Sequence, residues 1–97
     1  MGAGGEALSL AKRYVANLDG AFSTLKVLEG PYVVGEEDLD YVLDLAKRYH
    51  EDAKGFLKAG RPLTSIAASS YAEGLLDALR FLGLVDFKWP GEEGPDG

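Results

Sequence analysis

Apolar residues recur with a helical period between residues 39 and 82. They are spaced three or four positions apart, and the pattern is broken once, at Gly60-Arg61-Pro62. This spacing aligns side chains on one face of an α-helix, and such a face is buried only by packing against another helix. The predicted inward faces are Leu39, Val42, Leu43, Ala46, Tyr49, His50, Ala53, Phe56 and Leu57 and, after the break, Leu63, Ile66, Ala67, Ser70, Tyr71, Gly74, Leu75, Ala78, Leu79 and Leu82.

A further helix is predicted ahead of these two, from about Glu6 to Leu28. Gly20 lies in its middle and weakens it by about 1 kcal/mol relative to Ala. Gly30 followed by Pro31 is a typical helix end, because Gly adopts the left-handed cap and Pro cannot continue the helix. The predicted inward face of this helix is Ala11, Tyr14, Val15, Leu18, Phe22, Leu25 and Leu28.

Gly60 ends the second helix, Pro62 suits the first turn of the third, and Gly83 ends the third. Connections of a few residues make neighbouring helices run antiparallel. The predicted fold is therefore all-α, a three-helix antiparallel up-and-down bundle that forms one domain over residues 1–90. Residues 91–97, which are rich in Gly and acidic side chains, are predicted to be a short disordered tail.

The third helix carries more apolar surface than one bundle core needs. Small residues fill its first half, and a second apolar stripe of Ala68, Ala72 and Leu76 lies beside the main one. A helix that is apolar over so wide an arc is either the central helix of its own bundle or contacts a second subunit. We therefore expect a symmetric homodimer.

Phe87 and Trp89 follow the third helix, although the residues after Pro90 have a disordered composition. Large aromatic side chains lose favourable burial when they are left in water. We expect both to fold back over the end of the bundle, near the apolar loop at residues 31–34. If Trp89 is instead exposed in the isolated chain, it becomes a candidate residue for binding a partner.

Composition excludes several classes of function. The net charge of −6 disfavours nucleic-acid binding, where contacts of Lys and Arg with phosphate dominate the affinity. No apolar run approaches the roughly 20 residues of a membrane span, and the first residues do not resemble a signal peptide. We expect a cytoplasmic protein that binds neither nucleic acid nor membrane. The absence of Cys and Gln, with a single Asn, suggests a thermophilic source.

No set of residues predicts catalysis, a metal or a cofactor. His50 is the only imidazole, and no acid lies three or four residues from it, so the Glu-x-x-His signature of di-iron bundles is absent. We interpret it as a half-packed boundary residue. Glu36, Asp40 and Asp44 share one helix face, but a hard cation needs about six converging oxygens, so we interpret this face as solvated.

Glu73 and Asp77 lie four residues apart within the apolar third helix, and Arg80 follows Asp77 by three. This spacing allows an ion pair that fixes the packing of the helix. The alternative is a polar spot at an interface or pocket.

One stretch resembles a known family. The residues that carry the resemblance are Tyr49, Asp52, Ala53, Phe56, Leu57, Gly60 and Ala67, the run Ser70-Tyr71-Ala72-x-Gly74-Leu75-x-Asp77-Ala78, and Leu82-Gly83-Leu84. Over roughly residues 38–87 they are similar to the archaeal domain-of-unknown-function family numbered 357. The resemblance implies a three-helix bundle and an archaeal source, and it implies no activity.

The sequence therefore predicts a non-catalytic module for protein interaction or assembly, which forms a homodimer or docks to a larger protein. The alternative is a bundle that handles a small ligand or nucleotide in a pocket. The candidate interaction or pocket residues are Tyr49, Asp52, Tyr71, Asp77 and Trp89.

Overall fold

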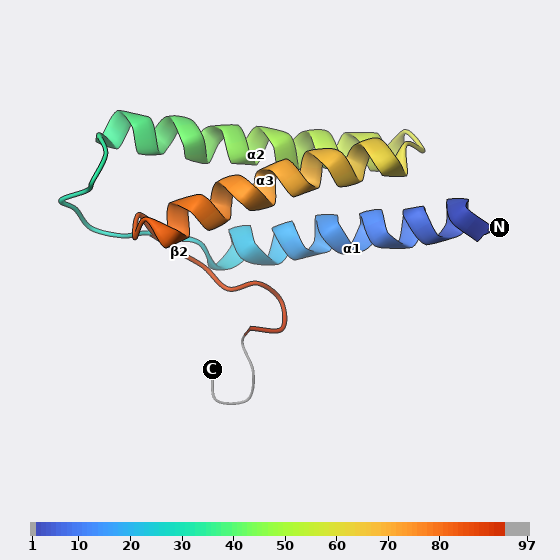
Figure 1. The fold of residues 1–97 in the computed structure, drawn as a ribbon, viewed down its shortest axis with the longest axis horizontal. Coiled ribbons are helices and arrows are strands. Elements are labelled where there is room, and N and C mark those ends of the chain that lie inside the picture. The colour runs from blue at the N-terminus through green and yellow to red at the C-terminus, as the bar shows by residue number, and fades with distance from the viewer. Residues whose placement is uncertain (1, 93–97) are drawn as a thin grey trace.

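The computed structural model describes residues 2–92, with side chains from residue 5 onward. It confirms the three-helix bundle (Figure 1). The helices are α1 (Gly2–Thr24), α2 (Glu36–Lys58) and α3 (Pro62–Phe81). Two-residue strands β1 (Lys26–Val27) and β2 (Val85–Asp86) pair antiparallel beyond the ends of α1 and α3. The strands were not predicted, and α1 ends before the predicted Leu28 because residues 26–27 leave the helix to pair with β2.

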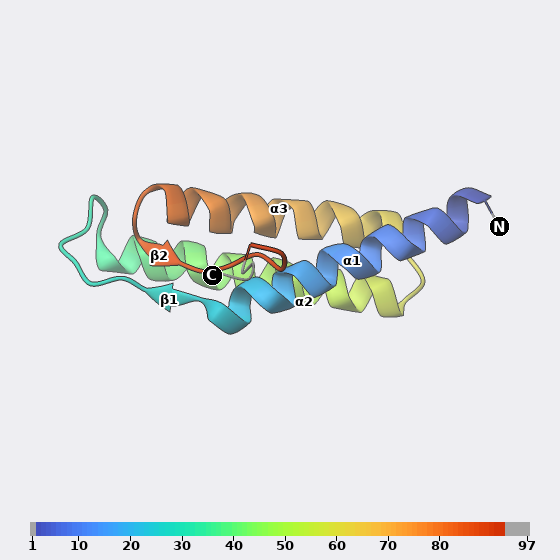
Figure 2. The same cartoon turned by 90° about the horizontal axis from the view of Figure 1, so that it is seen from below.

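The helices α2 and α3 lie side by side and run antiparallel, while α1 crosses this pair at an angle (Figure 2). The N-terminal end of α1 extends past the turn between α2 and α3 (Figure 1). The α1 helix has a more extensive contact with α3 than with α2. Leu63, in the first turn of α3, is 72% exposed.

Both α2 and α3 end in the same hydrogen-bonded cap at a glycine in the left-handed region. Gly60 has φ 76° and Gly83 has φ 75°. At Gly60, the N–H groups of residues 60 and 61 donate to the carbonyl oxygens of Leu57 and Phe56. At Gly83, those of residues 83 and 84 donate to Arg80 and Leu79 in the same pattern. These are Schellman motifs, which satisfy the last carbonyl groups of each helix, as the Gly positions predicted.

The core consists of two clusters of buried side chains. The larger is centred on the end of the bundle near the strands, and the smaller lies toward the turn between α2 and α3. The larger contains Leu18, Ala21, Leu39, Leu43, Ala46, Ala72, Leu76, Leu79, Leu84, Val85 and Phe87. The smaller contains Val15, Ala53 and Ala68. Ser65 Oγ donates a 2.8 Å hydrogen bond to the carbonyl of Ala53 and ties the start of α3 to α2.

The predicted inward face of α3 is wrong. Its buried residues are Ser65, Ala68, Ser69, Ala72, Leu76 and Leu79, so the core uses the stripe that we had expected to be secondary. Most of the predicted stripe is exposed, namely Leu63, Ala67, Ser70, Tyr71, Gly74, Ala78 and Leu82. The hydrophobic periodicity does not distinguish the two faces of the helix, because α3 is apolar on opposite sides. The small residues of the buried face let α3 approach its neighbours closely.

The chain after α3 folds back onto the bundle, as predicted, but at a different place. Phe87 is 2% exposed and Trp89 is half-buried. Instead of meeting the loop at residues 31–34, the segment pairs with β1 and then lies against α1. There the backbone N–H of Lys88 donates to Thr24 Oγ1 at 2.8 Å, and the Pro90 ring sits directly over Gly20.

Of the predicted disordered tail, residues 93–97 lie outside the described residues. Gly91 and Glu92 are described, and the Glu92 carboxylate accepts hydrogen bonds from Arg80 and from the backbone of Trp89.

Candidate interaction surface

The outward face of α3 is a continuous uncharged strip of exposed residues. We call it the α3 stripe. Its members are Leu63, Ala67, Ser70, Tyr71, Gly74, Ala78, Phe81 and Leu82. Four of them are large, and their exposed fractions are 72% for Leu63, 50% for Tyr71, 77% for Phe81 and 53% for Leu82.

The charges of α3 are confined to one flank of the helix. At about 100° per residue, the stripe covers roughly a third of the circumference, opposite the buried residues. The Asp, Glu, Lys and Arg residues of α3 are Glu73, Asp77 and Arg80 alone, and they lie together on the side toward the C-terminal segment. The stripe therefore offers apolar surface without any charge to desolvate.

On the side of α3 that faces α2, an aromatic pair extends the α3 stripe. The rings of Tyr49 and Tyr71 lie 4.4 Å apart between centroids, tilted by 49°. Tyr49 is half-buried on α2 and supports Tyr71 at the edge of the stripe. The structure thus brings together two of the residues proposed for a pocket. It places Asp52 on the exposed surface of α2, and Asp77 on the opposite flank of α3 against Trp89.

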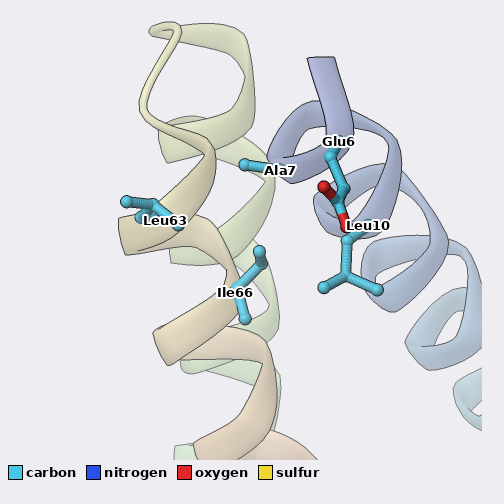
Figure 3. A pocket seen from close by; sticks show the side chains of 5 residues that line it. All are labelled: Glu6, Ala7, Leu10, Leu63 and Ile66. Carbon is cyan, nitrogen blue, oxygen red and sulfur yellow. The ribbon is translucent and has the colours of Figure 1, made fainter. Parts of the chain in front are cut away.

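An apolar groove adjoins the start of the stripe, between the first turns of α1 and α3. Its volume is about 220 Å³, it is open to solvent, and Ala7, Leu10, Leu63 and Ile66 line it with Glu6. Leu10 and Ile66 project into the space between the helices, whereas Leu63 points outward at the rim (Figure 3). Sequence reasoning missed this groove, because it depends on the angle at which α1 crosses α3.

The predicted pair of Asp77 and Arg80 forms, and it also holds the C-terminal segment. Arg80 Nη2 lies 3.6 Å from Asp77 Oδ1, and the same oxygen accepts a 3.2 Å hydrogen bond from Trp89 Nε1. The Arg80 guanidinium stacks 4.5 Å from the centroid of Phe87 and pairs with Glu92 at 3.1 Å. Three groups of the C-terminal segment, the Trp89 indole, the Phe87 ring and the Glu92 carboxylate, thus meet one flank of α3.

The pKa values of two carboxyl groups near this contact are shifted in opposite directions. The hydrogen bond from the Trp89 backbone, followed by that from Arg80, lowers the pKa of Glu92 below its ordinary value. Burial raises the pKa of Glu73, and the neighbouring charge of Asp77 raises it further. The fold therefore opposes the ionisation of Glu73.

His50 is buried rather than half-packed, because its ring stacks on Phe22 with 5.1 Å between centroids and 11° between planes. Asp19 Oδ1 lies 2.8 Å from Nε2, but Nε2 forms no hydrogen bond within the described part of the chain. The carboxylate is more than half exposed to solvent. This arrangement is a packed core residue with one acidic neighbour at the surface.

Within the described residues, no group of three or more His, Cys, Asp or Glu side chains is placed to hold a metal ion. Glu36, Asp40 and Asp44 are all exposed, and Asp44 pairs with Arg48 at 3.3 Å. No helix in the described part of the chain has the length and apolar character to cross a membrane.

The fold and its exposed surface define a small all-α bundle with an unpartnered apolar helix face. The chain belongs to the family described as Protein of unknown function (DUF357), whose model matches residues 13–85. The match includes the second half of α1, whereas the resemblance visible in the sequence began at about residue 38. No curated protein and no solved structure matches the chain.

Proposed function

We propose that this protein is a non-catalytic module for protein interaction or assembly, and that the α3 stripe is its binding surface. The partner is a helix of another chain, supplied by a second copy or by a larger protein. The observation that carries the proposal is the exposure of Leu63, Tyr71, Phe81 and Leu82 along one uncharged helix face.

This face has the composition of an interface core. Such cores are depleted in charge and enriched in aromatic residues, which describes the stripe and its Tyr pair. A small acidic protein seldom leaves a contiguous apolar strip in water unless something binds there. The small residues Ala67, Gly74 and Ala78 between the large ones let a partner helix approach the α3 backbone.

The alternative role, a bundle that handles a small ligand or nucleotide, receives less support. Its proposed pocket requires Tyr49, Asp52, Tyr71 and Asp77 to converge, and only the two tyrosines lie together. The groove near Leu63 is lined almost wholly by apolar side chains, and such a surface has no groups to recognise a phosphate or a base.

Composition supports the rest of the proposal. We place the protein in the cytoplasm of a thermophilic archaeon, without nucleic-acid or membrane partners. The net charge of −6 disfavours nucleic acid, and the lack of Cys and Gln suggests a thermophile. The archaeal source is what the resemblance to the family implies.

Retention of proteins from an extract of the native cells tests the interaction role. The immobilised full chain is compared with Gly74→Glu, which puts a charge at the centre of the stripe, and with Ala16→Glu, which puts the same charge on an exposed site of α1. We expect the original chain and Ala16→Glu to retain the same protein, its own copies included, and Gly74→Glu to lose it. Equal retention by all three, or none by any, contradicts the proposal.

A further inference from the structure

The two ends of the α3 stripe are complementary in shape. Leu63 and Phe81 are 18 residues apart, which is about five helical turns, so they project from the same side of α3 about 27 Å apart. At the Leu63 end the stripe opens into the apolar groove beside α1. At the other end Phe81 protrudes into solvent, 77% exposed. The Leu63 end therefore has an apolar groove, and the Phe81 end has a projecting aromatic ring.

The groove is large enough for the ring. A cavity of roughly 150 Å³ accommodates benzene, and the groove offers about 220 Å³. Its apolar walls, Leu10 and Ile66, face one another across the opening (Figure 3). A phenyl ring entering from the solvent side passes Leu63 at the rim and contacts both walls.

We propose that a second copy of this chain occupies the stripe, with the two α3 helices antiparallel about a two-fold axis that passes between Tyr71 and Gly74. This arrangement deepens the interaction role proposed above and rests on it. It places Phe81 of each copy in the groove beside Leu63 of the other.

The same register matches large residues with small ones. With the axis between residues 71 and 74, Tyr71 of one copy lies over Gly74 of the other, and Ala67 lies level with Ala78. Gly74 has open space around the position of a Cβ atom, so the Tyr71 ring has room there. In a parallel pair, Tyr71 would meet its own copy and the two Gly74 positions would face each other across a gap. Packing therefore favours the antiparallel pair.

Charge is consistent with a second copy as the partner. The molecule carries a net charge of −6, so two copies repel one another at long range, and contact through an uncharged surface adds no local like-charge pair and no charge to desolvate. The α3 stripe has no ionisable group besides the tyrosine hydroxyl. By contrast, a strongly basic partner would be attracted to the acidic start of α2 at residues 36–40.

The proposed contact has to reach the size of a specific interface. A specific interface covers about 800 Å² on each partner, against a total surface of 6035 Å² for this chain. The contact combines the full length of α3, about 30 Å, with two symmetric insertions of Phe81 at its ends.

Disulfide cross-linking tests the register, because the chain contains no Cys of its own. A disulfide requires Cα atoms within about 7 Å. In the proposed dimer the two copies of Gly74 are offset by only about 4.5 Å along the helices, whereas the two copies of Ala67 are offset by about 16 Å. Gly74→Cys is expected to cross-link with itself. Ala67→Cys is expected to cross-link with Ala78→Cys in a mixture and not with itself.

Asp52→Cys, exposed on α2, measures cross-linking by random collision. Self-cross-linking of Ala67→Cys above this background shows a parallel pair and overturns the proposed register. If no stripe cysteine cross-links above background, self-docking is overturned. The interaction role then still stands if Gly74→Glu abolishes retention of a protein from the native extract.

The insertion of Phe81 is tested by its own variant. Phe81→Ala is expected to raise the dimer dissociation constant at least about a hundredfold, because each dimer loses two buried rings. Val33→Ala is the matched control, since Val33 is 76% exposed but lies in the loop before α2; it is expected to change the constant by less than about threefold. Equal effects of the two variants overturn the insertion.

Discussion

The Trp89 indole N–H donates to Asp77 Oδ1 at 3.2 Å, and this bond joins the end of the described chain to the flank of α3. Asp77 was expected to form an ion pair that fixes helix packing. It pairs with Arg80 one turn away, and its larger role is to anchor the C-terminal segment. Phe87, which belongs to the same segment, is almost fully buried. The C-terminal segment is therefore part of the core of the bundle.

Replacing Asp77 tests that anchor. Asp77→Ala is expected to lower the free energy of unfolding by about 1–2 kcal/mol, because it removes the charged acceptor of a half-buried indole. Asp77→Asn keeps an acceptor oxygen and is expected to cost less than about 1 kcal/mol. Urea unfolding followed by Trp89 fluorescence measures both. Asp52→Ala, at an exposed position on α2, is the control, and an equal loss there would remove the special role of Asp77.

A second prediction concerns the contact between α1 and the C-terminal segment. A Cβ atom at Gly20 would lie 2.7 Å from Pro90 Cγ, whereas one at Gly55 on α2 meets nothing within 4 Å. Gly55→Ala is expected to raise the free energy of unfolding by about 1 kcal/mol through helix propensity. Gly20→Ala is expected to gain less, because it displaces Pro90, and to make Trp89 more accessible to acrylamide. If the two variants stabilise equally and quenching is unchanged, Pro90 does not pack on Gly20.

A third prediction separates the two faces of α3. Ala72→Leu is expected to destabilise the fold by about 1–3 kcal/mol, because Ala72 is fully buried and the larger side chain overpacks the core. Ala67 was predicted to face the core, where Ala67→Leu would have the same effect, but Ala67 is exposed. In dilute protein, where self-association is negligible, it is expected to change stability by less than about 0.5 kcal/mol. Thermal unfolding of both variants measures the two changes in stability. The reverse order would show that the other face of α3 is buried.

A fourth prediction follows from the raised pKa of Glu73. Because this pKa lies above the ordinary 4.5, the folded state binds the proton more tightly than the unfolded state. The stabilisation by the protonated form is complete below about pH 4.5 and is lost as the pH rises through the folded pKa. Glu73→Gln, which stays neutral, is expected to match the original chain at low pH and to be more stable than it at neutral pH.

Glu51 provides a control of opposite sign. Its pKa is lowered by the hydrogen bond from Lys54, so its carboxylate stabilises the fold above about pH 4.5 and this contribution is lost as the pH falls. Glu51→Gln is therefore expected to be less stable than the original chain at neutral pH. Urea unfolding between pH 4 and pH 7 measures both differences. If the Glu73→Gln difference does not grow with pH, the fold does not oppose ionisation of Glu73.

The helix ends were predictable because Gly60, Pro62 and Gly83 act locally through backbone conformation. The antiparallel order followed from the short connections, and the folding back of Phe87 followed from the cost of leaving its ring in water. These features depend on neighbouring residues or on a single strong term in the free energy.

The faces of α3 and the groove could not be predicted in the same way. Both sides of the helix are apolar, so the choice between Ala67 and Ala68 as the inward residue depends on how closely α2 and α1 approach. The crossing angle of α1 creates the groove by Leu63 and is a property of the whole bundle. The pair of Lys26 with Asp86 in the strands joins residues 60 positions apart, for which two-residue segments give no periodic signal.

The central claim is that the outward face of α3 binds a second copy of the chain. Sedimentation equilibrium of the purified protein tests it most directly, with Gly74→Glu and Ala16→Glu run beside it. We expect the original chain and Ala16→Glu to sediment as dimers at tens of micromolar and Gly74→Glu as a monomer. A strict monomer for the original chain, or a dimer that persists unchanged in Gly74→Glu, would contradict it.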